Sequence, residues 1–314
     1  MCSAPDELLG RRFSHYVVNG LIGLGQTGRV YSAHDERSGV EVALKVLAKN
    51  VLHMPKVKEA LQKRVRVLAR LGHPNVAAAY EVGTSAGGYD FIASELVAGQ
   101  TLAEILSQGP VSSLEIVRIG MHIAVGLDAA HAYDLVHGNL DPEKVMVTPD
   151  GEVKILGFAR PTLTGGFDLH RTPSGTIDVT AAAALPYVPP ERLRGEGVDV
   201  RSDVFGTGAI MYEMATGRPP FSHGQLAVLL DVLMNHNPLP PSVLNPLVPS
   251  TLEQMILKAL RKNPDHRQQS ASELLCDIRW VERLGDAAHR VRCTGARTWW
   301  GLLAGGPHPE ALMN

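Results

Sequence analysis

Two short segments of this 314-residue sequence contain residue types that could bind phosphate groups or act on them chemically. In the first, Gly23, Gly25 and Gly28 lie between two β-rich runs, and glycines at this spacing let a hairpin backbone approach a phosphate closely. Lys45 ends the next apolar run, where a lysine can hold a phosphate. Taken alone, such glycines more often form a turn that binds nothing, and such a lysine more often reaches water. No helix is expected directly after the glycines, so the pattern disfavours a dinucleotide-binding fold.

The second segment runs from His137 to Lys144 with the sequence HGNLDPEK, and Leu156-Gly157-Phe158 follows it. It contains a histidine, an amide, two carboxylates and a lysine. Such groups can orient a hydroxyl, accept a proton or neutralise a charged ligand. This segment is therefore the second candidate for chemistry.

Two kinds of element would position these segments. Residues 15–47 alternate in short β-rich runs broken by glycine and predict an antiparallel sheet, which the runs 78–83 and 89–95 extend. Between them, apolar residues at helical spacing predict a helix that begins at Pro55. After Gly99 the pattern is mainly helical, and capping boxes mark helix starts. The boxes pair Thr101 with Glu104, Ser112 with Glu115, Ser250 with Glu253 and Ser270 with Glu273.

Joined with later motifs, the chain resembles bacterial and eukaryotic-type Ser/Thr protein kinase domains over roughly residues 13–284. The resemblance implies an α+β, bilobal protein-kinase-like fold. A small antiparallel β-sheet lobe with one helix would span about 13–95 and a hinge about 95–99. A larger, mainly helical lobe would span about 100–284, which leaves 285–314 as a C-terminal tail. The later motifs are Tyr187-Val188-Pro189-Pro190-Glu191, Ser202-Asp203-Val204-Phe205-Gly206, Tyr212-Glu213-Met214 and Asp265-His266-Arg267.

The resemblance also implies which residues would hold a nucleotide and which would stabilise the frame. The nucleotide-binding residues would be Gly23, Gly25, Gly28, Val30, Ala43, Lys45, Glu95, Val97 and Lys144. The structural residues would be His137, Phe158, Glu191, Asp203 and Arg267. Among these, the resemblance implies a buried ion pair between Glu191 and Arg267, a tie from Asp203 to the catalytic-loop backbone, and packing of His137 against Phe158.

The residues that carry out phosphoryl transfer in the family are replaced in this sequence. Asn139 occupies the position of the general base, and an amide does not accept a proton at neutral pH. Asp141 occupies the position of the catalytic-loop lysine. Lys144 and Gly157 replace the metal ligands, so we expect no intact catalytic residue, no metal site and no Mg²⁺ as cofactor.

One further departure concerns the predicted small-lobe helix. The position that carries the glutamate partner of the lysine in the family holds Arg64. If Arg64 approached Lys45 to about 4 Å, the repulsion would cost a few kcal/mol. The sequence therefore predicts either an outward helix or an anion between these two cations.

Three functions are compatible with these observations. The leading expectation is a pseudokinase, a catalytically impaired domain that is not an enzyme and signals by binding or scaffolding a protein partner. The second is a weakly active or atypical Ser/Thr protein kinase that transfers phosphate from ATP and uses carboxylates such as Asp141 or Asp150. The third is a structural domain with an empty cleft. ATP binding stays open, because Lys144 either neutralises phosphate in place of a metal ion or is a solvated surface lysine.

Composition excludes other classes of function. The hydrophobic content of 45% is that of a globular protein, and the net charge of −2 with a pI near 6.7 argues against nucleic acid as a partner. No run approaches the roughly 20 apolar residues of a membrane span. The cysteines Cys2, Cys276 and Cys293 lie far apart, which argues against a disulfide framework or a zinc site and favours the cytoplasm.

Overall fold

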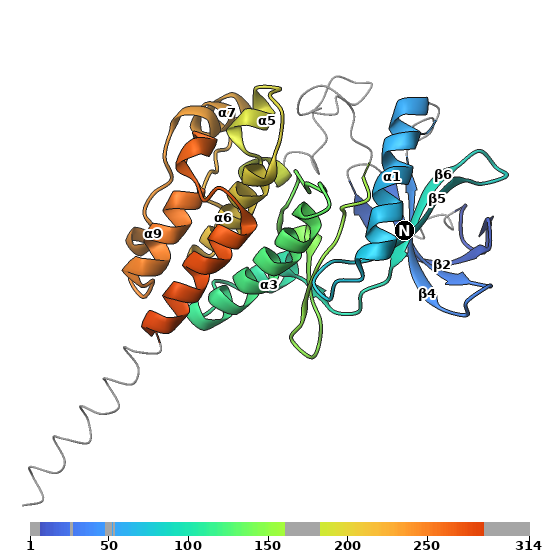
Figure 1. Ribbon diagram of the computed structural model, residues 1–314, viewed down its shortest axis with the longest axis horizontal. Coiled ribbons are helices and arrows are strands. Elements are labelled where there is room, and N and C mark those ends of the chain that lie inside the picture. The colour runs from blue at the N-terminus through green and yellow to red at the C-terminus, as the bar shows by residue number, and fades with distance from the viewer. Residues whose placement is uncertain (1–6, 26–27, 48–51, 53, 161–182, 286–314) are drawn as a thin grey trace, which may run out of the picture.

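The computed structural model describes residues 7–25, 28–47, 52, 54–160 and 183–285. These residues form two lobes, a small lobe built on a β-sheet and a larger helical lobe (Figure 1). The α+β bilobal fold is therefore confirmed. Of the expected tail, everything after residue 285 lies outside the described residues.

The small lobe is built on one antiparallel sheet of six strands in the order β1-β2-β3-β4-β6-β5. Consecutive strands pair as hairpins from β1 to β4, and β6 then pairs with both β4 and β5. The predicted antiparallel sheet is confirmed. The strands are β1 (Arg12–Phe13), β2 (Tyr16–Gly25), β3 (Gly28–Asp35), β4 (Glu41–Leu47), β5 (Ala79–Thr84) and β6 (Asp90–Glu95).

The two faces of this sheet have different partners. On one face, Leu44, Tyr31 and Phe91 are buried in a cluster that belongs to the small lobe alone. On the other face, Ile92 is buried in the main core, together with the apolar side of α1 (Pro55–Leu71). Because Lys45 pairs directly with Ile92 across the strands, its side chain leaves the sheet on this second face, toward the rest of the molecule.

Helix α1 forms where the sequence predicts it. Pro55 occupies its first turn, where a missing N–H is tolerated, and Gly72 ends it in the left-handed conformation with φ 52°. After α1 the chain passes along the large lobe, where Ala77 N donates to Ile155 O at 3.0 Å and Asn75 O accepts from Ile155 N at 2.9 Å. This connection joins α1 to the strands that follow the HGNLDPEK segment.

The larger lobe is mainly helical, with α3, α6 and α9 packed side by side (Figure 1). A three-stranded sheet, β7-β8-β9, lies between this group and the small lobe. Its strands are β7 (Gln100–Thr101), β8 (Val145–Val147) and β9 (Val153–Ile155). The helices of the larger lobe are α2 (Leu102–Leu106), α3 (Ser113–His131), α5 (Pro190–Leu193), α6 (Val200–Thr216), α7 (Leu226–Asn235), α8 (Pro241–Leu244), α9 (Ser250–Ala259) and a last helix at 271–285.

Three of the four predicted capping boxes begin a helix. Thr101 and Glu104 form the complete reciprocal box, and Ser112 and Ser270 each accept a hydrogen bond from the backbone N–H three residues later. The fourth is wrong, because α9 is preceded by Pro249 as N-cap and Glu253 instead accepts from Ser242 N at 2.7 Å. No helix of the described residues is long and apolar enough to cross a membrane.

Candidate functional site

The small lobe contributes Lys45 to the junction between the lobes. Lys45 lies on β4 directly opposite Val30 of β3, and Ala43 leaves the sheet on the same face two residues earlier. Its ammonium makes no hydrogen bond or ion pair with any described residue. Burial, together with the positive charges of Lys144 and Arg160, lowers the pKa of Lys45 to about 8. An incoming anion would therefore stabilise its charged form.

The glycine-rich hairpin lies next to Lys45, with Gly25 opposite Gly28 where β2 and β3 meet. A Cβ at Gly28, which has φ +152°, would lie 1.9 Å from the carbonyl oxygen of Val46. Only glycine fits there, because the start of β3 lies so close to the backbone of β4 at Val46 and Leu47. A Cβ at Gly23 would meet nothing within 4 Å. The fold itself thus explains Gly28, whereas the space beside Gly23 is open.

In the large lobe, Asp203 of α6 holds the HGNLDPEK segment through its backbone. Asp203 accepts from His137 N at 2.8 Å and from Gly138 N at 2.6 Å, and it contacts His131 Nε2 at 2.8 Å. The ring of His137 meets Phe158 edge-on, with centroids 4.8 Å apart. Burial lowers the pKa of His137 to about 4, so the ring is neutral at pH 7. These contacts hold the start of the segment, at His137 and Gly138, in place.

Asn139, at the position of the general base, is engaged by an arginine. Its side-chain oxygen accepts from Arg192 Nη1 at 2.7 Å, and the same nitrogen contacts the carbonyl oxygen of Gly138. Arg192 belongs to the short helix α5 that follows Pro189. The amide is therefore held in place by a neighbouring cation.

Lys144 and Gly157 lie together, and the charge of Lys144 acts on Lys45. Backbone atoms join their segments, because Leu156 N donates to Lys144 O at 2.8 Å. A Cβ at Gly157 would lie 3.4 Å from Lys144 Cδ and 3.5 Å from His137 Nε2. The stem of Lys144 therefore occupies the space beside Gly157. Its ammonium lies 3.4 Å from Asp141 Oδ1, and the Asp141 carboxylate is buried.

Arg160 adds a cation that the sequence alone did not reveal. Its pKa is lowered to about 9, mainly by burial and then by the charges of Arg192 and Arg64, against the opposing effect of Asp141 and Asp203. It also acts on Lys45 and His137, so it lies at the same junction. Lys45, Lys144 and Arg160 are called the junction cations below.

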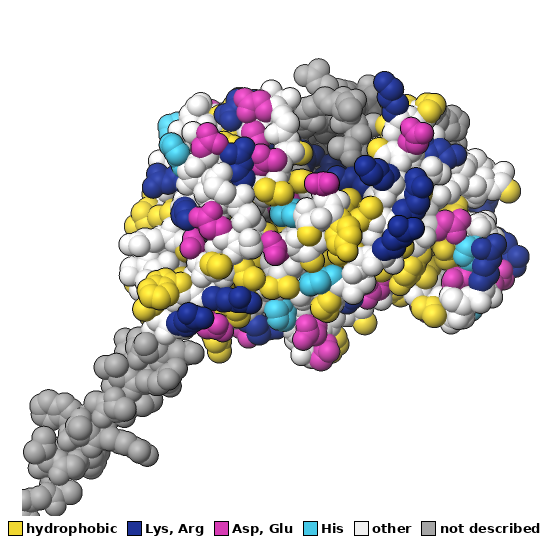
Figure 2. All heavy atoms as spheres, in the orientation of Figure 1, with side chains coloured by type: hydrophobic (Ala, Val, Ile, Leu, Met, Phe, Trp, Pro, Cys, Tyr) yellow, Lys and Arg dark blue, Asp and Glu magenta, His cyan; other side chains and the backbone are white. Residues whose placement is uncertain are grey.

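Arg64 does not face Lys45. Its guanidinium donates from Nη1 to Phe158 O and from Nη2 to Val136 O, both at 3.0 Å. It thus joins α1 to the backbone of the large lobe, and neither an outward helix nor an intervening anion is needed to separate the two cations. The outer side of α1 is different, because Lys63 and other basic residues there are exposed and Figure 2 shows Lys and Arg side chains gathered over this helix.

Replacing Arg64 by methionine is expected to lower the free energy of unfolding by about 1.5–3 kcal/mol, because two hydrogen bonds from a charged donor are lost. Lys63→Met, an exposed neighbour on the same helix, should change it by less than about 0.5 kcal/mol. Arg64→Glu restores the residue type of the family but should be worse than methionine, since its carboxylate would face two carbonyl oxygens. Urea denaturation of the three variants checks this order. An Arg64→Met variant as stable as the unchanged chain would contradict the bracing role.

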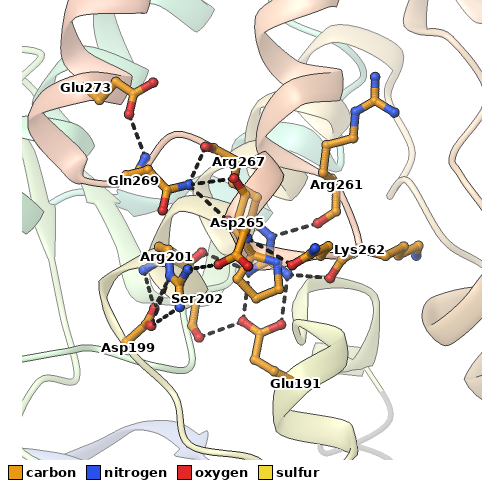
Figure 3. Close-up of polar contacts among 12 residues, drawn as sticks. Glu191, Asp199, Arg201, Ser202, Arg261, Lys262, Asp265, Arg267, Gln269 and Glu273 are labelled. Atoms are coloured by element: carbon orange, nitrogen blue, oxygen red, sulfur yellow. Dashed lines mark hydrogen bonds and ion pairs between the residues drawn. The ribbon is translucent and has the colours of Figure 1, made fainter.

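Glu191 and Arg267 are brought together in the interior of the large lobe (Figure 3). Both terminal nitrogens of the Arg267 guanidinium donate to the Glu191 carboxylate at 2.8 Å. The Arg267 side chain is 0% exposed and the Glu191 side chain 5%. Ser202 also donates to Glu191 at 2.8 Å. Burial by itself would raise the pKa of Glu191, but the bonds and charge of Arg267 hold it below its ordinary value. The remaining Arg267 donors reach carbonyl oxygens of Arg201, Arg261 and Lys262.

The hinge region follows β6. Glu95 is fixed there by an ion pair with Lys154 at 2.8 Å and by a hydrogen bond from Ala78 N at 3.1 Å. Ser94 donates to Ala43 O at 3.4 Å. Val97, two residues after Glu95, lies in an irregular stretch that leads to β7. By contrast, Asp150 is exposed in the turn between β8 and β9, bonded to Thr148, and does not join the site.

The chain belongs to the protein kinase domain family, whose model matches residues 16–281. A Streptomyces coelicolor protein named "Probable serine/threonine-protein kinase SCO3848" is 34% identical over 281 residues, which cover 87% of this chain and 40% of that protein. The serine/threonine-protein kinase PknB of Mycobacterium leprae is 31% identical over 88% of this chain and 44% of its own length. The chain thus spans less than half the length of these two relatives.

Solved structures agree on the fold. The kinase domain of Mycobacterium tuberculosis PknI superposes with a TM-score of 0.66 at 22% identity, covering 86% of this chain and 97% of that one. At this identity the likeness supports the fold and nothing more.

The expectation of a pseudokinase that is not an enzyme is contradicted by these relatives, which are named serine/threonine-protein kinases. That expectation rested on the loss of the general base and of the metal ligands, each of which typically lowers the rate of transfer by about 10²-fold or more. The structure places the stem of Lys144 beside Gly157, and the charge of Arg160 acts on Lys45. The family uses ATP.

Proposed function

We propose that this chain is an atypical Ser/Thr protein kinase domain that transfers the γ-phosphoryl group of ATP to a serine or threonine hydroxyl of a protein substrate. The observation that carries the proposal is the group of junction cations, Lys45, Lys144 and Arg160, at the place where the two lobes of a kinase fold meet. Phosphoryl transfer depends mainly on positioning and on neutralising charge, and cations serve both needs. We assign the activity to residues 13–284.

The nucleotide would lie against the small-lobe face that carries Lys45. In this proposal the adenine contacts the backbone of residues 95–97, and Val30 and Ala43 cover it from the sheet. The phosphates pass beneath the hairpin of Gly23, Gly25 and Gly28 toward Lys45 and Lys144. The support for this path is that Val30 and Ala43 leave the sheet on the same face as Lys45.

In the transfer step, the substrate oxygen forms a bond to the γ-phosphorus while the bond from that phosphorus to the bridging oxygen of ADP breaks. The hydroxyl proton passes to Asp141, the carboxylate that contacts Lys144. Asn139 orients the hydroxyl but takes no proton, so the step lacks the usual base and is slow. A missing general base typically costs about 10²–10⁴ in rate.

The first test is the variant Lys45→Met, which removes the small-lobe cation. It should lower incorporation of radiolabelled γ-phosphate by about 10²-fold or more, as expected when one electrostatic stabiliser is lost. Lys63→Met, which removes an exposed lysine far from the junction, should leave incorporation unchanged. If Lys45→Met and the unchanged chain incorporate label equally, the activity comes from a contaminant and the proposal fails.

A further inference from the structure

The metal that kinases use does not fit the residues at this junction. Mg²⁺ prefers oxygen ligands, and in the family these come from an aspartate and an asparagine. Here Gly157 has no side chain to offer, and the stem of Lys144 lies where a Cβ of residue 157 would touch it at 3.4 Å. An ammonium group cannot ligate a metal ion and repels it. Of the carboxylates in the HGNLDPEK segment, only Asp141 contacts Lys144, and that contact already uses its charge.

The same junction is rich in positive charge without matching negative charge. The Lys45 ammonium has no hydrogen-bond or ion-pair partner among the described residues, and Lys144 and Arg160 act on it with the same sign. Asp203, the other buried carboxylate nearby, is already bound by two backbone N–H groups. Like charges held together away from bulk water repel one another more strongly than they would in water. A polyanion between them would remove this repulsion.

We infer that Lys45, Lys144 and Arg160 form a binding site for the phosphates of ATP that works without a metal ion. This inference rests on the proposed function, because it concerns the same nucleotide. In it, Lys144 takes the charge-neutralising role of the metal from its place beside Gly157, Lys45 approaches from the sheet above, and Arg160 offers a planar fork that suits phosphate oxygens. Arg64 is excluded from the site, since its donors are committed to Phe158 O and Val136 O.

The experiment measures ATP affinity by isothermal titration calorimetry in buffer freed of metal ions on a chelating resin, and again with added Mg²⁺. ATP should bind in the metal-free buffer, and added Mg²⁺ should not tighten binding. Adenosine, which has the same base and no phosphate, serves as the control ligand and should bind far more weakly than ATP.

Single variants then locate the phosphates. Lys144→Met and Arg160→Met should each weaken metal-free ATP binding about tenfold or more, the effect of one charge-assisted hydrogen bond, and should leave adenosine binding unchanged. Lys63→Met is the matched control for charge and should bind ATP like the unchanged chain. Because Lys144 is 28% exposed, its replacement should leave the fold intact, and thermal unfolding without ligand checks this for each variant.

The outcomes separate this inference from the proposed kinase activity. ATP binding only in the presence of Mg²⁺ would overturn the inference and leave the kinase proposal standing. Metal-free binding that Lys144→Met and Arg160→Met do not weaken would overturn it as well, because the phosphates would lie elsewhere. Metal-free binding weakened by both variants, but with no phosphate transfer, would support the inference and overturn the kinase proposal. No ATP binding in either buffer would overturn both.

Discussion

The triple variant Asn139→Asp, Lys144→Asn and Gly157→Asp is expected to transfer phosphate about 10³-fold faster than the unchanged chain, or more. Restoring a general base is worth about 10²–10⁴ in rate, and restoring charge stabilisation by a metal about 10²–10³. The activity of the variant should also become dependent on Mg²⁺, since two oxygen ligands replace an ammonium and a bare backbone position.

The local geometry indicates that all three side chains fit. Asp at position 139 keeps the shape of the amide and gains a charge facing Arg192, which now donates at 2.7 Å. A Cβ at Gly157 would make only ordinary contacts, but φ is +90° there, so any side chain is strained, and aspartate tolerates a positive φ better than most residues. One of those contacts, at 3.4 Å, is to Lys144 Cδ, which the Lys144→Asn change removes.

The single reversions are the controls, and each should raise the rate by less than about tenfold, because these residues act as a unit. Incorporation of radiolabelled phosphate into the protein and into a peptide library containing serine and threonine measures the rates. A triple variant no faster than the single reversions would show that the frame lacks some other requirement of transfer.

Replacing Arg267 by methionine is expected to lower the free energy of unfolding by about 3–5 kcal/mol, because Glu191 would be left charged and unpaired in the interior. Three backbone carbonyl oxygens, of Arg201, Arg261 and Lys262, would lose a donor as well. Arg201→Met is the matched control in the same region. Arg201 pairs with Asp199 and Asp265 nearer the surface, so its loss should cost under about 1 kcal/mol.

The double variant Arg267→Met/Glu191→Leu separates the ion pair from the other bonds. It should recover part of the lost stability, since no buried charge remains, but not all of it, since the carbonyl oxygens stay unpaired. The pair should also depend on pH. The lowered pKa of Glu191 means that its stabilisation is complete above the ordinary value of 4.5 and is lost as the pH falls through the lowered value. Equal stability of Arg267→Met and Arg201→Met in urea would contradict this account.

The sequence predicted the fold well because its signals are local or shared with a family. Apolar periodicity and Gly72 place α1, the alternation in 15–47 places the sheet, and Thr101 and Ser112 cap the helices they precede. The failure at Ser250 is also local, because Pro249 already supplies the N-cap and Glu253 finds a partner in a different helix.

The sequence predicted several residues of the site but not the full set of charged side chains that gather there. Lys45 and Lys144 follow from motif positions, whereas Arg160 has no periodic signal and acts through contacts between lobes. The sequence predicted that an outward helix or an anion separates Arg64 from Lys45, yet the long side chain of Arg64 reaches carbonyl oxygens at positions 136 and 158. Those acceptors are backbone atoms, which sequence patterns do not display. The leading functional expectation was wrong because it rested on the missing base and metal ligands. Lys144 was already visible among the replaced positions, whereas Arg160 gave no signal in the sequence.

The proposed kinase activity requires that this chain transfer phosphate from ATP to serine or threonine. The most direct measurement is mass spectrometry of the purified chain and a protein substrate after incubation with ATP labelled by ¹⁸O in its γ-phosphate, in metal-free, Mg²⁺ and Mn²⁺ buffers. The account predicts isotopically heavy phosphate on serine or threonine in the sample from the unchanged chain, and its loss with Lys45→Met. Absence of heavy phosphate from every sample, with every metal condition, would contradict it.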